Sequence, residues 1–485
     1  MAAALALPGI ALAFPNNASL ASDQWYLAMD RAWDYWPQPP QLKEVKVAVI
    51  DSGIDYGHPE FAGRIAAGRS FVSGTTWKRD TDGHGTFVAG LIAANPAGGE
   101  GIAGLAFNAK LLIAKVVPPD DEGVSLEAEV AAIKWAVREG ARVINLSLGG
   151  QRDPQDLRLD QYSAAERNAI EYAVSKDVVV VAAVGNGTSA PSIPWIYADY
   201  PAALPHVIGV AALRQNGSVP AWSNRDAVYV DIAAPGDDIV STIPRNLIDT
   251  TQPDCVGVPY STCGSPEFRD AIGTSFAAPQ VSAAAALLLG VDPKLTADQV
   301  IWLLERSATD ENPSTGCPNC AAGRDSLTGW GRLDVDRALT MLEDGKLPVP
   351  DRYEPNDEAG ESGPYPYSGA HPFGPPRTIS ASLDYWDDPV DVYSISLTKG
   401  RRLFVRLSPS TRDAAGLVLW KPGTQRVDGP TAETSEQAAT GVSTGNQKLL
   451  TYLVPATGTY YVEVRFAPHA QGHITYALSV ATKPG

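Results

Sequence analysis

The chain has 485 residues, of which 44% are hydrophobic and 19% are charged, a composition typical of globular proteins. This length exceeds what a single hydrophobic core organises, so we expect one large and one small domain. The 38 basic and 55 acidic residues give a formal net charge of -17, which argues against nucleic acid or an anionic membrane as a partner. We find no apolar run approaching the roughly 18 to 20 residues that a membrane-spanning helix needs, so we predict no membrane span.

Residues 1–20 have the character of a processing segment. Met1 to Phe14 has an apolar body and an Ala-x-Ala ending at Ala13, as in the second half of a signal peptide, but it lacks the basic start. A second interpretation is that these residues are the end of a pro-segment. Under either interpretation we exclude them from the core.

From Val45 to about Val240, short β-branched runs alternate with helical patterns, which predicts a parallel sheet with helices on both faces. The strand-like runs are 45–50, 111–117, 143–148, 178–184 and 206–211. Between the second and third runs, Ser125 can cap a crossover helix that Gly140 ends. Ligands of such sheets bind beyond the carboxyl ends of the strands, so the residues directly after each run are candidate site residues.

Two further helices are expected at 275–289 and 297–307, and a last short segment ends near residue 344. Residues 346–369 are rich in Pro, Gly, Ser and acidic residues, which is typical of a linker. The pattern then changes to short alternating stretches, which predict a small all-β sandwich. We therefore divide the chain into a processing segment (1–20), an α/β domain (21–345), a linker (346–369) and a β-sandwich (370–485).

The four cysteines, Cys255, Cys263, Cys317 and Cys320, lie in Gly/Pro/Ser-rich stretches and suit two disulfides in an oxidising compartment. Pairing of Cys255 with Cys263 and of Cys317 with Cys320 is the favoured connectivity. A zinc site is the alternative, but only Cys317 and Cys320 have the C-x-x-C spacing.

Three glycine-flanked segments bring a carboxylate, an imidazole and a hydroxyl to predicted strand or helix boundaries. These groups are Asp51, His84 and Ser275. Acyl transfer needs this set, because a serine hydroxyl is a poor nucleophile unless an imidazole takes its proton. The imidazole in turn needs a carboxylate to fix its tautomer. The order Asp, His, Ser along the chain is that of subtilisin.

Residues 48–54, 84–90 and 273–279 resemble the three signature blocks of the subtilase family of serine proteases, and the resemblance extends over about residues 22–340. It implies a subtilisin-like parallel sheet and a serine endopeptidase with Asp51, His84 and Ser275 as its triad. It also implies that Asn186 donates to the oxyanion of the tetrahedral intermediate. An Asn that merely tolerates a turn between two glycines is the alternative.

The same resemblance places an extended substrate along Ser147, Leu148 and Gly149 as an added strand. It also places Asp199, which precedes Tyr200-Pro201, at the floor of the pocket for the P1 side chain. A carboxylate there would favour Lys or Arg at P1. The alternative is that Asp199 is exposed to solvent, or that its loop differs in shape from that of the family.

No cofactor is expected for catalysis, but the resemblance allows a structural Ca²⁺ held by Glu60, Asn95 and Glu100. We expect protein or peptide substrates, a monomer and a secreted protein.

Residues 352–357, 391–393 and 458–462 resemble the bacterial pre-peptidase C-terminal domain of secreted proteases. That resemblance implies a role in secretion, in surface association or in maturation, and a solubilising appendage is the alternative. A non-catalytic binding protein on a protease scaffold is the rival for the whole chain, although every group that the chemistry requires is present.

Overall fold

The computed structural model describes residues 19–36, 40–95, 101–119, 123–156, 158, 160–187, 190–247, 267–345, 347, 351–354, 356–357, 359, 369–384, 388, 390–424, 427, 434–467 and 473–485. The chain forms two compact units. The first lies within residues 1–152 and 177–345, and the second within residues 153–176 and 346–485.

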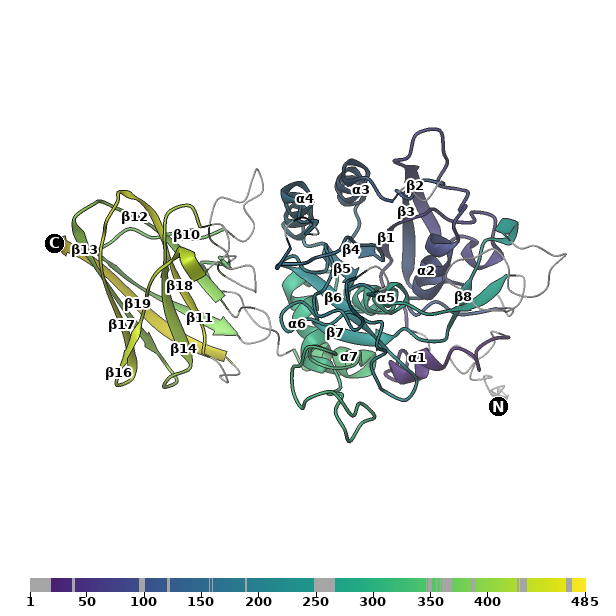
Figure 1. Ribbon diagram of the computed structural model, residues 1–485. Coiled ribbons are helices and arrows are strands. Elements are labelled where there is room, and N and C mark those ends of the chain that lie inside the picture. Colours follow the sequence, from purple (N-terminus) through teal and green to yellow (C-terminus); the bar gives the residue numbers. More distant parts are fainter. Residues whose placement is uncertain are drawn as a thin grey trace, which may run out of the picture. The chain divides into compact units, whose positions relative to one another are not determined.

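The first unit contains a seven-stranded sheet in the order β2-β3-β1-β4-β5-β6-β7, with every neighbouring pair parallel (Figure 1). Its strands are β1 (Val45–Asp51), β2 (Ile65–Ser70), β3 (Ala109–Lys115), β4 (Val143–Leu146), β5 (Val179–Ala183), β6 (Val207–Leu213) and β7 (Ile232–Pro235). The parallel sheet predicted from the β-branched runs is thus confirmed. The two edge strands were not predicted, because neither has a β-branched run.

The helices of the first unit are α1 (Trp25–Met29), α2 (His84–Ala93), α3 (Leu126–Arg138), α5 (Thr274–Val291), α6 (Ala297–Ser307) and α7 (Val335–Glu343). Ser125 caps α3 as expected, since its side chain accepts from the backbone N–H of Ala128 at 3.2 Å. A short antiparallel pair, β8 (Ile239–Thr242) and β9 (Phe268–Ala271), completes this unit. Helix α4 (Ala164–Val174), between β4 and β5 along the chain, belongs to the segment 153–176.

Strand β1 lies at the point where the direction of the strand order changes. It pairs with β3 on one side and with β4 on the other. Asp51 is its last residue, and Ser147 directly follows β4. Because the carboxyl ends of parallel strands share one edge of the sheet, this topology brings both residues to the place where open sheets bind ligands.

Helix α5 is an 18-residue apolar helix, and among the described residues it is the single helix long and apolar enough to cross a membrane. The statement that no apolar run approaches this length was therefore wrong. However, 89% of α5 is buried within the protein. It packs against β4, β5 and β6, as a core helix of a parallel sheet does.

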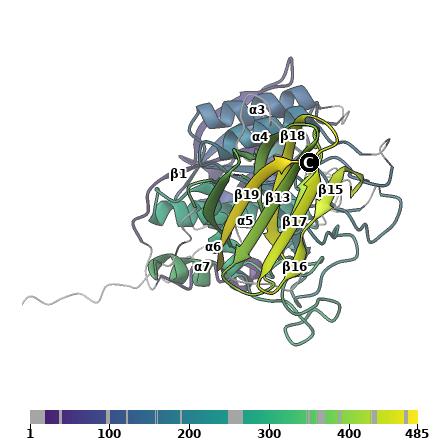
Figure 2. The ribbon, with the colours of Figure 1, turned by 90° about the vertical axis from the view of Figure 1, so that its left-hand side faces the viewer.

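The second unit holds two five-stranded sheets, in the orders β10-β12-β18-β14-β15 and β11-β19-β13-β17-β16. Figure 2 shows β19, β13 and β17 of the second sheet side by side. The strands are β10 (His371–Pro372), β11 (Arg377–Asp384), β12 (Val390–Leu397), β13 (Arg401–Pro409), β14 (Ala415–Trp420), β15 (Gln437–Thr440), β16 (Val442–Thr444), β17 (Gln447–Leu453), β18 (Gly458–Phe466) and β19 (His473–Pro484). The predicted β-sandwich is confirmed.

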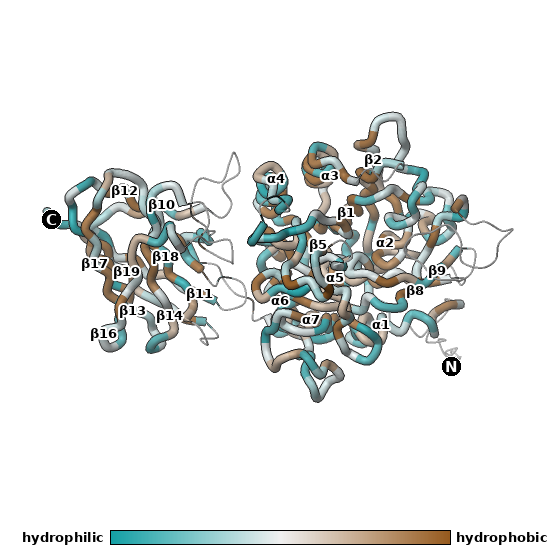
Figure 3. The backbone as a smooth tube through the Cα atoms, in the orientation of Figure 1, coloured by the Kyte–Doolittle hydropathy of each residue, from teal (hydrophilic) through white to brown (hydrophobic). Residues whose placement is uncertain are grey.

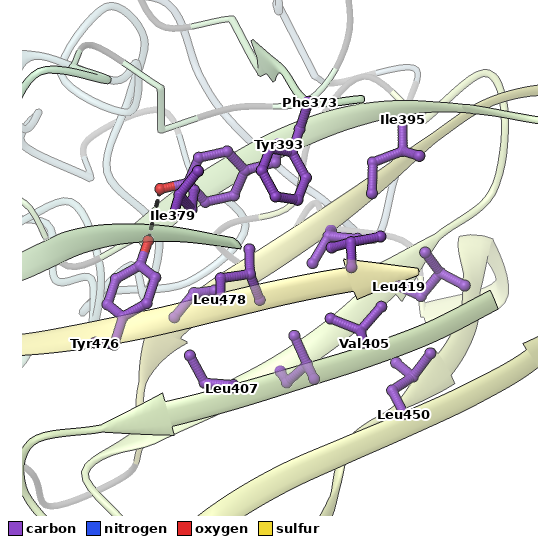
Figure 4. Packing of buried hydrophobic residues seen from close by; sticks show 14 of the residues in the cluster. Phe373, Ile379, Tyr393, Ile395, Val405, Leu407, Leu419, Leu450, Tyr476 and Leu478 are labelled. Atoms are coloured by element: carbon purple, nitrogen blue, oxygen red, sulfur yellow. Dashed lines mark hydrogen bonds between the residues drawn. The ribbon is translucent and has the colours of Figure 1, made fainter. Parts of the chain in front are cut away.

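The sandwich core forms mainly from every second residue of β11, β12, β13, β14, β18 and β19. Burial alternates accordingly along β13 and β19, and Figure 3 shows brown, apolar stretches next to teal ones in this unit. Figure 4 shows Val405, Leu419 and Leu478 packed together, and a hydrogen bond of 2.7 Å joins the hydroxyls of Tyr393 and Tyr476. Burial of both tyrosines is tolerated because their polar ends are paired.

The disulfide between Cys317 and Cys320 is present, as predicted. Cys255 and Cys263 lie outside the described residues, and so does Glu100 of the predicted calcium site.

Candidate active site

Asp51 and His84 face each other at the carboxyl edge of the sheet. Asp51 ends β1 and His84 is the first residue of α2. The Nδ1 atom of His84 lies 2.9 Å from each carboxylate oxygen of Asp51. Their side chains are only 10% and 2% exposed, so the interaction is little screened by water. A carboxylate on Nδ1 leaves Nε2 as the proton-accepting nitrogen of the neutral ring.

The proton affinity of His84 reflects two opposing effects. Burial lowers the pKa of His84, but the charge and hydrogen bond of Asp51, together with the charges of Asp82 and Asp80, raise it. The balance lies above the ordinary value of 6.5. A ring with this pKa can accept a proton near neutral pH and hold it as a stabilised imidazolium.

Ser275 is the second residue of α5, so its backbone N–H is among those at the helix start that lack an intrahelical partner. The next residue, Phe276, places its ring 5.4 Å from the ring of His84, measured between centroids. The hydroxyl of Ser275 donates to the carbonyl of Ser147 at 3.3 Å. The predicted nucleophile therefore lies at the same edge of the sheet as the Asp51–His84 pair.

Asn186 follows β5 and is anchored to the start of α5. Its Oδ1 accepts from the backbone N–H of Thr274 at 2.9 Å and from the Thr274 hydroxyl at 3.0 Å. A backbone N–H can only donate, so the atom that it meets must be the amide oxygen, which fixes the orientation of the side chain. The amide nitrogen is thereby held on the other side of the group, where a Cβ atom at Gly273 would lie 3.7 Å from it.

Asp199 lies between the segments that carry Gly149 and Gly185. A Cβ atom at Gly185 would be 2.1 Å from Asp199 Oδ2, and one at Gly149 would be 3.4 Å from Asp199 Cβ. The carboxylate accepts from the side-chain amide of Asn224 at 3.1 Å. Gly185 also has φ of 99°, so the close approach and the backbone conformation both require glycine there.

The carboxyl group of Asp199 is partly protonated near neutral pH. Burial raises the pKa of Asp199 to about 7, although hydrogen bonds from the Arg152 backbone and from Asn224 lower it. The guanidinium of Arg152 is engaged with Asp226 at 2.7 Å. The structure thus places Asp199 close to Gly149 and Gly185, with a carboxyl group whose charge depends on pH.

Glu60 and Asn95 of the predicted calcium site are neighbours, since the backbone N–H of Asn95 donates to the carbonyl of Glu60 at 2.9 Å. Glu60 is buried, and its Oε2 has no hydrogen-bond partner within the described part of the chain. Burial raises the pKa of Glu60 to about 7. An unpartnered carboxylate oxygen of this kind fits a bound cation.

The second unit holds an acidic group that the sequence analysis did not single out as a metal site. Carboxylate oxygens of Asp351, Glu354 and Asp391 lie within 4.8 Å of one another, and so do those of Glu354, Asp357 and Asp388. Burial, and then the charges of Asp357 and Asp391, raise the pKa of Glu354. These oxygens could hold a divalent cation, which would relieve their mutual repulsion. The acidic run 354–358 was the available indication in the sequence.

Buried polar residues that support the site were also missed. Asp80 and Asn145 are both fully buried. Asp80 accepts from Ser52 and Gly83, which adjoin Asp51 and His84 in the chain. Asn145 donates to the hydroxyl of Ser147, which in turn donates to the carbonyl of Ser275. The position of Asp80, four residues before His84 in a loop rich in Asp and Gly, was a weak indication of a helix-capping role.

Comparison with known proteins agrees with this geometry. Residues 42–331 match the model of the subtilase family, and residues 389–465 match that of the bacterial pre-peptidase C-terminal domain. Subtilisin DY of Bacillus licheniformis is 36% identical over 266 residues, which cover 55% of this chain and 84% of that protein. Thermitase of Thermoactinomyces vulgaris is 33% identical over 279 residues, covering 56% of this chain and 85% of that protein.

A longer alignment, of 318 residues at 35% identity, relates the chain to fervidolysin of Fervidobacterium pennivorans. It covers 62% of this chain and 41% of that protein. The family match takes in more than half of the chain and includes the Asp51–His84 pair and Ser275. The chain belongs to the subtilase family of serine endopeptidases and carries a bacterial pre-peptidase C-terminal domain.

Proposed function

We propose that the chain hydrolyses peptide bonds through an acyl-enzyme formed on Ser275. His84 takes the hydroxyl proton as Ser275 attacks the scissile carbonyl, and it gives that proton to the leaving amine. Asp51 holds the imidazole in the required tautomer and stabilises the imidazolium. The observation that carries this proposal is the buried contact of His84 Nδ1 with both oxygens of Asp51, at the edge of the sheet that also holds Ser275.

The tetrahedral intermediate would be stabilised by two donors, the side-chain amide of Asn186 and the backbone N–H of Ser275. The two hydrogen bonds from Thr274 to Asn186 Oδ1 support this role, because they turn the amide nitrogen away from Thr274. The positive end of the α5 dipole adds to the stabilisation.

Substrate would pair with Ser147, Leu148 and Gly149 as an added strand, with the P1 side chain directed toward Asp199. When Asp199 is ionised, it would form a charge-assisted hydrogen bond with Lys or Arg at P1. The nearness of Asp199 to Gly149 and Gly185 supports this placement. A preference for basic P1 residues that increases with pH follows from it.

We also propose that the protein acts outside the cell, as a monomer, with Ca²⁺ as a structural ion. The disulfide between Cys317 and Cys320 suits an oxidising compartment. Glu60 with Asn95 and the cluster around Glu354 supply the oxygen ligands that Ca²⁺ prefers. None of these residues belongs to the triad, so the contribution of the ion would be to stability.

A fluorophosphonate probe tests the central proposal. We expect the wild-type protein to be labelled and to cleave peptides, and Ser275→Ala to lose both properties while keeping its thermal transition. Absence of labelling in folded wild-type protein would instead favour the non-catalytic scaffold.

A further inference from the structure

A network around the carboxylate of Asp80 connects the two elements that carry Asp51 and His84. Asp80 is fully buried. Its Oδ1 accepts from the hydroxyl of Ser52 at 2.9 Å and from the backbone N–H groups of Asp82 and Gly83 at 3.1 and 2.9 Å. Its Oδ2 accepts from the backbone N–H and the hydroxyl of Thr86 at 2.9 and 2.7 Å. Five donors thus meet one carboxylate.

These donors come from both sides of the Asp51–His84 contact. Ser52 follows Asp51 at the end of β1, and its backbone N–H donates to Asp51 Oδ1 at 2.7 Å. Its hydroxyl also accepts from the backbone N–H of Gly85 at 2.8 Å. Thr86 and Gly85 lie in the first turn of α2, which begins at His84. Asp80 therefore joins the end of β1 to the start of α2.

The start of α2 depends on this contact. Its N-cap residue, Gly83, has no side chain that could accept from the helix. The N–H groups of the first turn lack intrahelical partners, so they need hydrogen-bond acceptors from outside the helix. Asp80 accepts from the N–H of Thr86, and the hydroxyl of Ser52 accepts from that of Gly85. These bonds fix the position of the helix relative to β1.

We propose that Asp80 is a positioning residue of the protease, whose buried carboxylate, acting through Ser52 and Thr86, holds Asp51 and His84 at the separation that keeps the imidazole in the tautomer able to accept the Ser275 proton. This inference rests on the proposed function of the triad. It adds a residue that contacts neither the substrate nor the reacting atoms.

The charge of Asp80 has a second effect, which makes the proposal testable. The charged groups that act on His84 are Asp51 on β1 and Asp80 and Asp82 in the loop before α2. Lys115, at the end of β3, interacts with the same three carboxylates, and α5 contributes the neutral ring of Phe276. Asp80 is one of the groups that raise the pKa of His84. Activity that needs neutral His84 is lost as the pH falls through this pKa, so removing the charge of Asp80 should move that loss to lower pH.

Two variants separate the geometric effect from the electrostatic effect. Asp80→Asn removes the charge and places an amide donor against the donors of Thr86. Ser52→Ala keeps the charge and removes the hydroxyl that bridges Asp80 and Gly85. We expect kcat to fall in both, by up to about 10²-fold for a misplaced triad, with little change in KM. The acid limb of the kcat/KM profile should move to lower pH in Asp80→Asn and stay in place in Ser52→Ala.

Asp325→Asn is the matched control, because Asp325 accepts from Leu327 and Thr328 in a similar turn and has no hydrogen bond to the triad within the described chain. An unchanged kcat in folded Ser52→Ala, or an equal loss in Asp325→Asn, would overturn the proposal. If Asp80→Asn does not fold, the test depends on Ser52→Ala and on Ser52→Thr, which keeps the hydroxyl. We then expect kcat to fall in Ser52→Ala and to stay close to that of the wild type in Ser52→Thr. If wild-type protein is neither labelled nor active, the proposed function fails instead, and an NMR titration of the His84 imidazole in wild type and Asp80→Asn still tests the role of Asp80.

Discussion

Ser147 and Ser275 are joined by reciprocal hydrogen bonds. The hydroxyl of Ser147 donates to the backbone carbonyl of Ser275 at 2.7 Å, and the hydroxyl of Ser275 donates to the carbonyl of Ser147 at 3.3 Å. Behind them, Asn145 donates to the Ser147 hydroxyl at 2.9 Å and accepts from Ser282 at 2.8 Å. The proposed nucleophile is therefore hydrogen-bonded to the segment after β4, which we propose as the substrate-binding segment.

Replacing Ser147 by Ala should lower kcat by about fivefold, because one hydrogen bond of about 1 kcal/mol no longer fixes the Ser275 backbone. Steady-state cleavage of a short peptide measures the change. Ser192→Ala, which removes an exposed hydroxyl, is the control and should leave kcat unaltered. An identical kcat in the two variants would show that the Ser147 contact does not affect the chemical step.

Asp51→Asn should lower kcat by about 10⁴-fold, the effect known for this change in a Ser-His-Asp protease, which we adopt as an expectation. The amide would donate to His84 Nδ1 and leave the proton on Nε2, where it blocks acceptance of the Ser275 proton. Activity should be compared with the thermal transition, which we expect to stay close to that of the wild type. A folded variant with nearly full activity would contradict the proposed triad.

Asn186→Leu should reduce kcat by about 10² to 10³, the loss known for the oxyanion-hole amide of subtilisin. KM should change little, because the amide contacts the charge that develops in the transition state. Thr274→Val serves as a graded comparison, since it removes one of the two donors that orient Asn186. A change confined to KM would place Asn186 in substrate binding.

The preference for Arg over Phe at P1 should increase as the pH rises through about 7, because the pKa of Asp199 is raised to about 7 and its carboxyl group is charged only above that value. The ratio of kcat/KM for two substrates differing only at P1 is the suitable measurement, since protonation of His84 cancels in it. In Asp199→Asn the ratio should be low at every pH. A ratio that stays constant with pH in the wild type would refute an ionised Asp199 in the P1 pocket.

Chelation of divalent cations should lower the thermal stability of the protein, and added Ca²⁺ should restore it. Without a cation, the carboxylates around Glu354 repel one another, and Glu60 keeps an unpartnered oxygen. Glu354→Gln and Glu60→Gln distinguish the two sites. By elemental analysis, each variant should lose the metal bound at its own site and keep the metal bound at the other. Metal-free protein with an unaltered transition after chelation would eliminate both sites.

Local patterns in the sequence were enough for much of the fold. The β-branched runs gave the inner strands, and the N-cap at Ser125 was correct to the residue. Such features depend on a few neighbouring residues. A run of β-branched residues indicates a strand buried on both faces, and one side-chain oxygen is enough to cap a helix. The edge strands β2 and β7 could not be predicted, because neither has a β-branched run. The burial of α5 could not be predicted either, because it depends on contacts with strands that are distant in the sequence.

The sequence by itself determined which chemical groups we propose for catalysis, Asp51, His84 and Ser275, because glycine-flanked boundaries mark them individually. Only the tertiary structure decided how they are held. The Ser147–Ser275 contact joins residues 128 apart and the Ser52–Asp80 contact joins residues 28 apart. The strength of such contacts comes from burial away from water, which the packed sheet and helices create and no short stretch of sequence encodes.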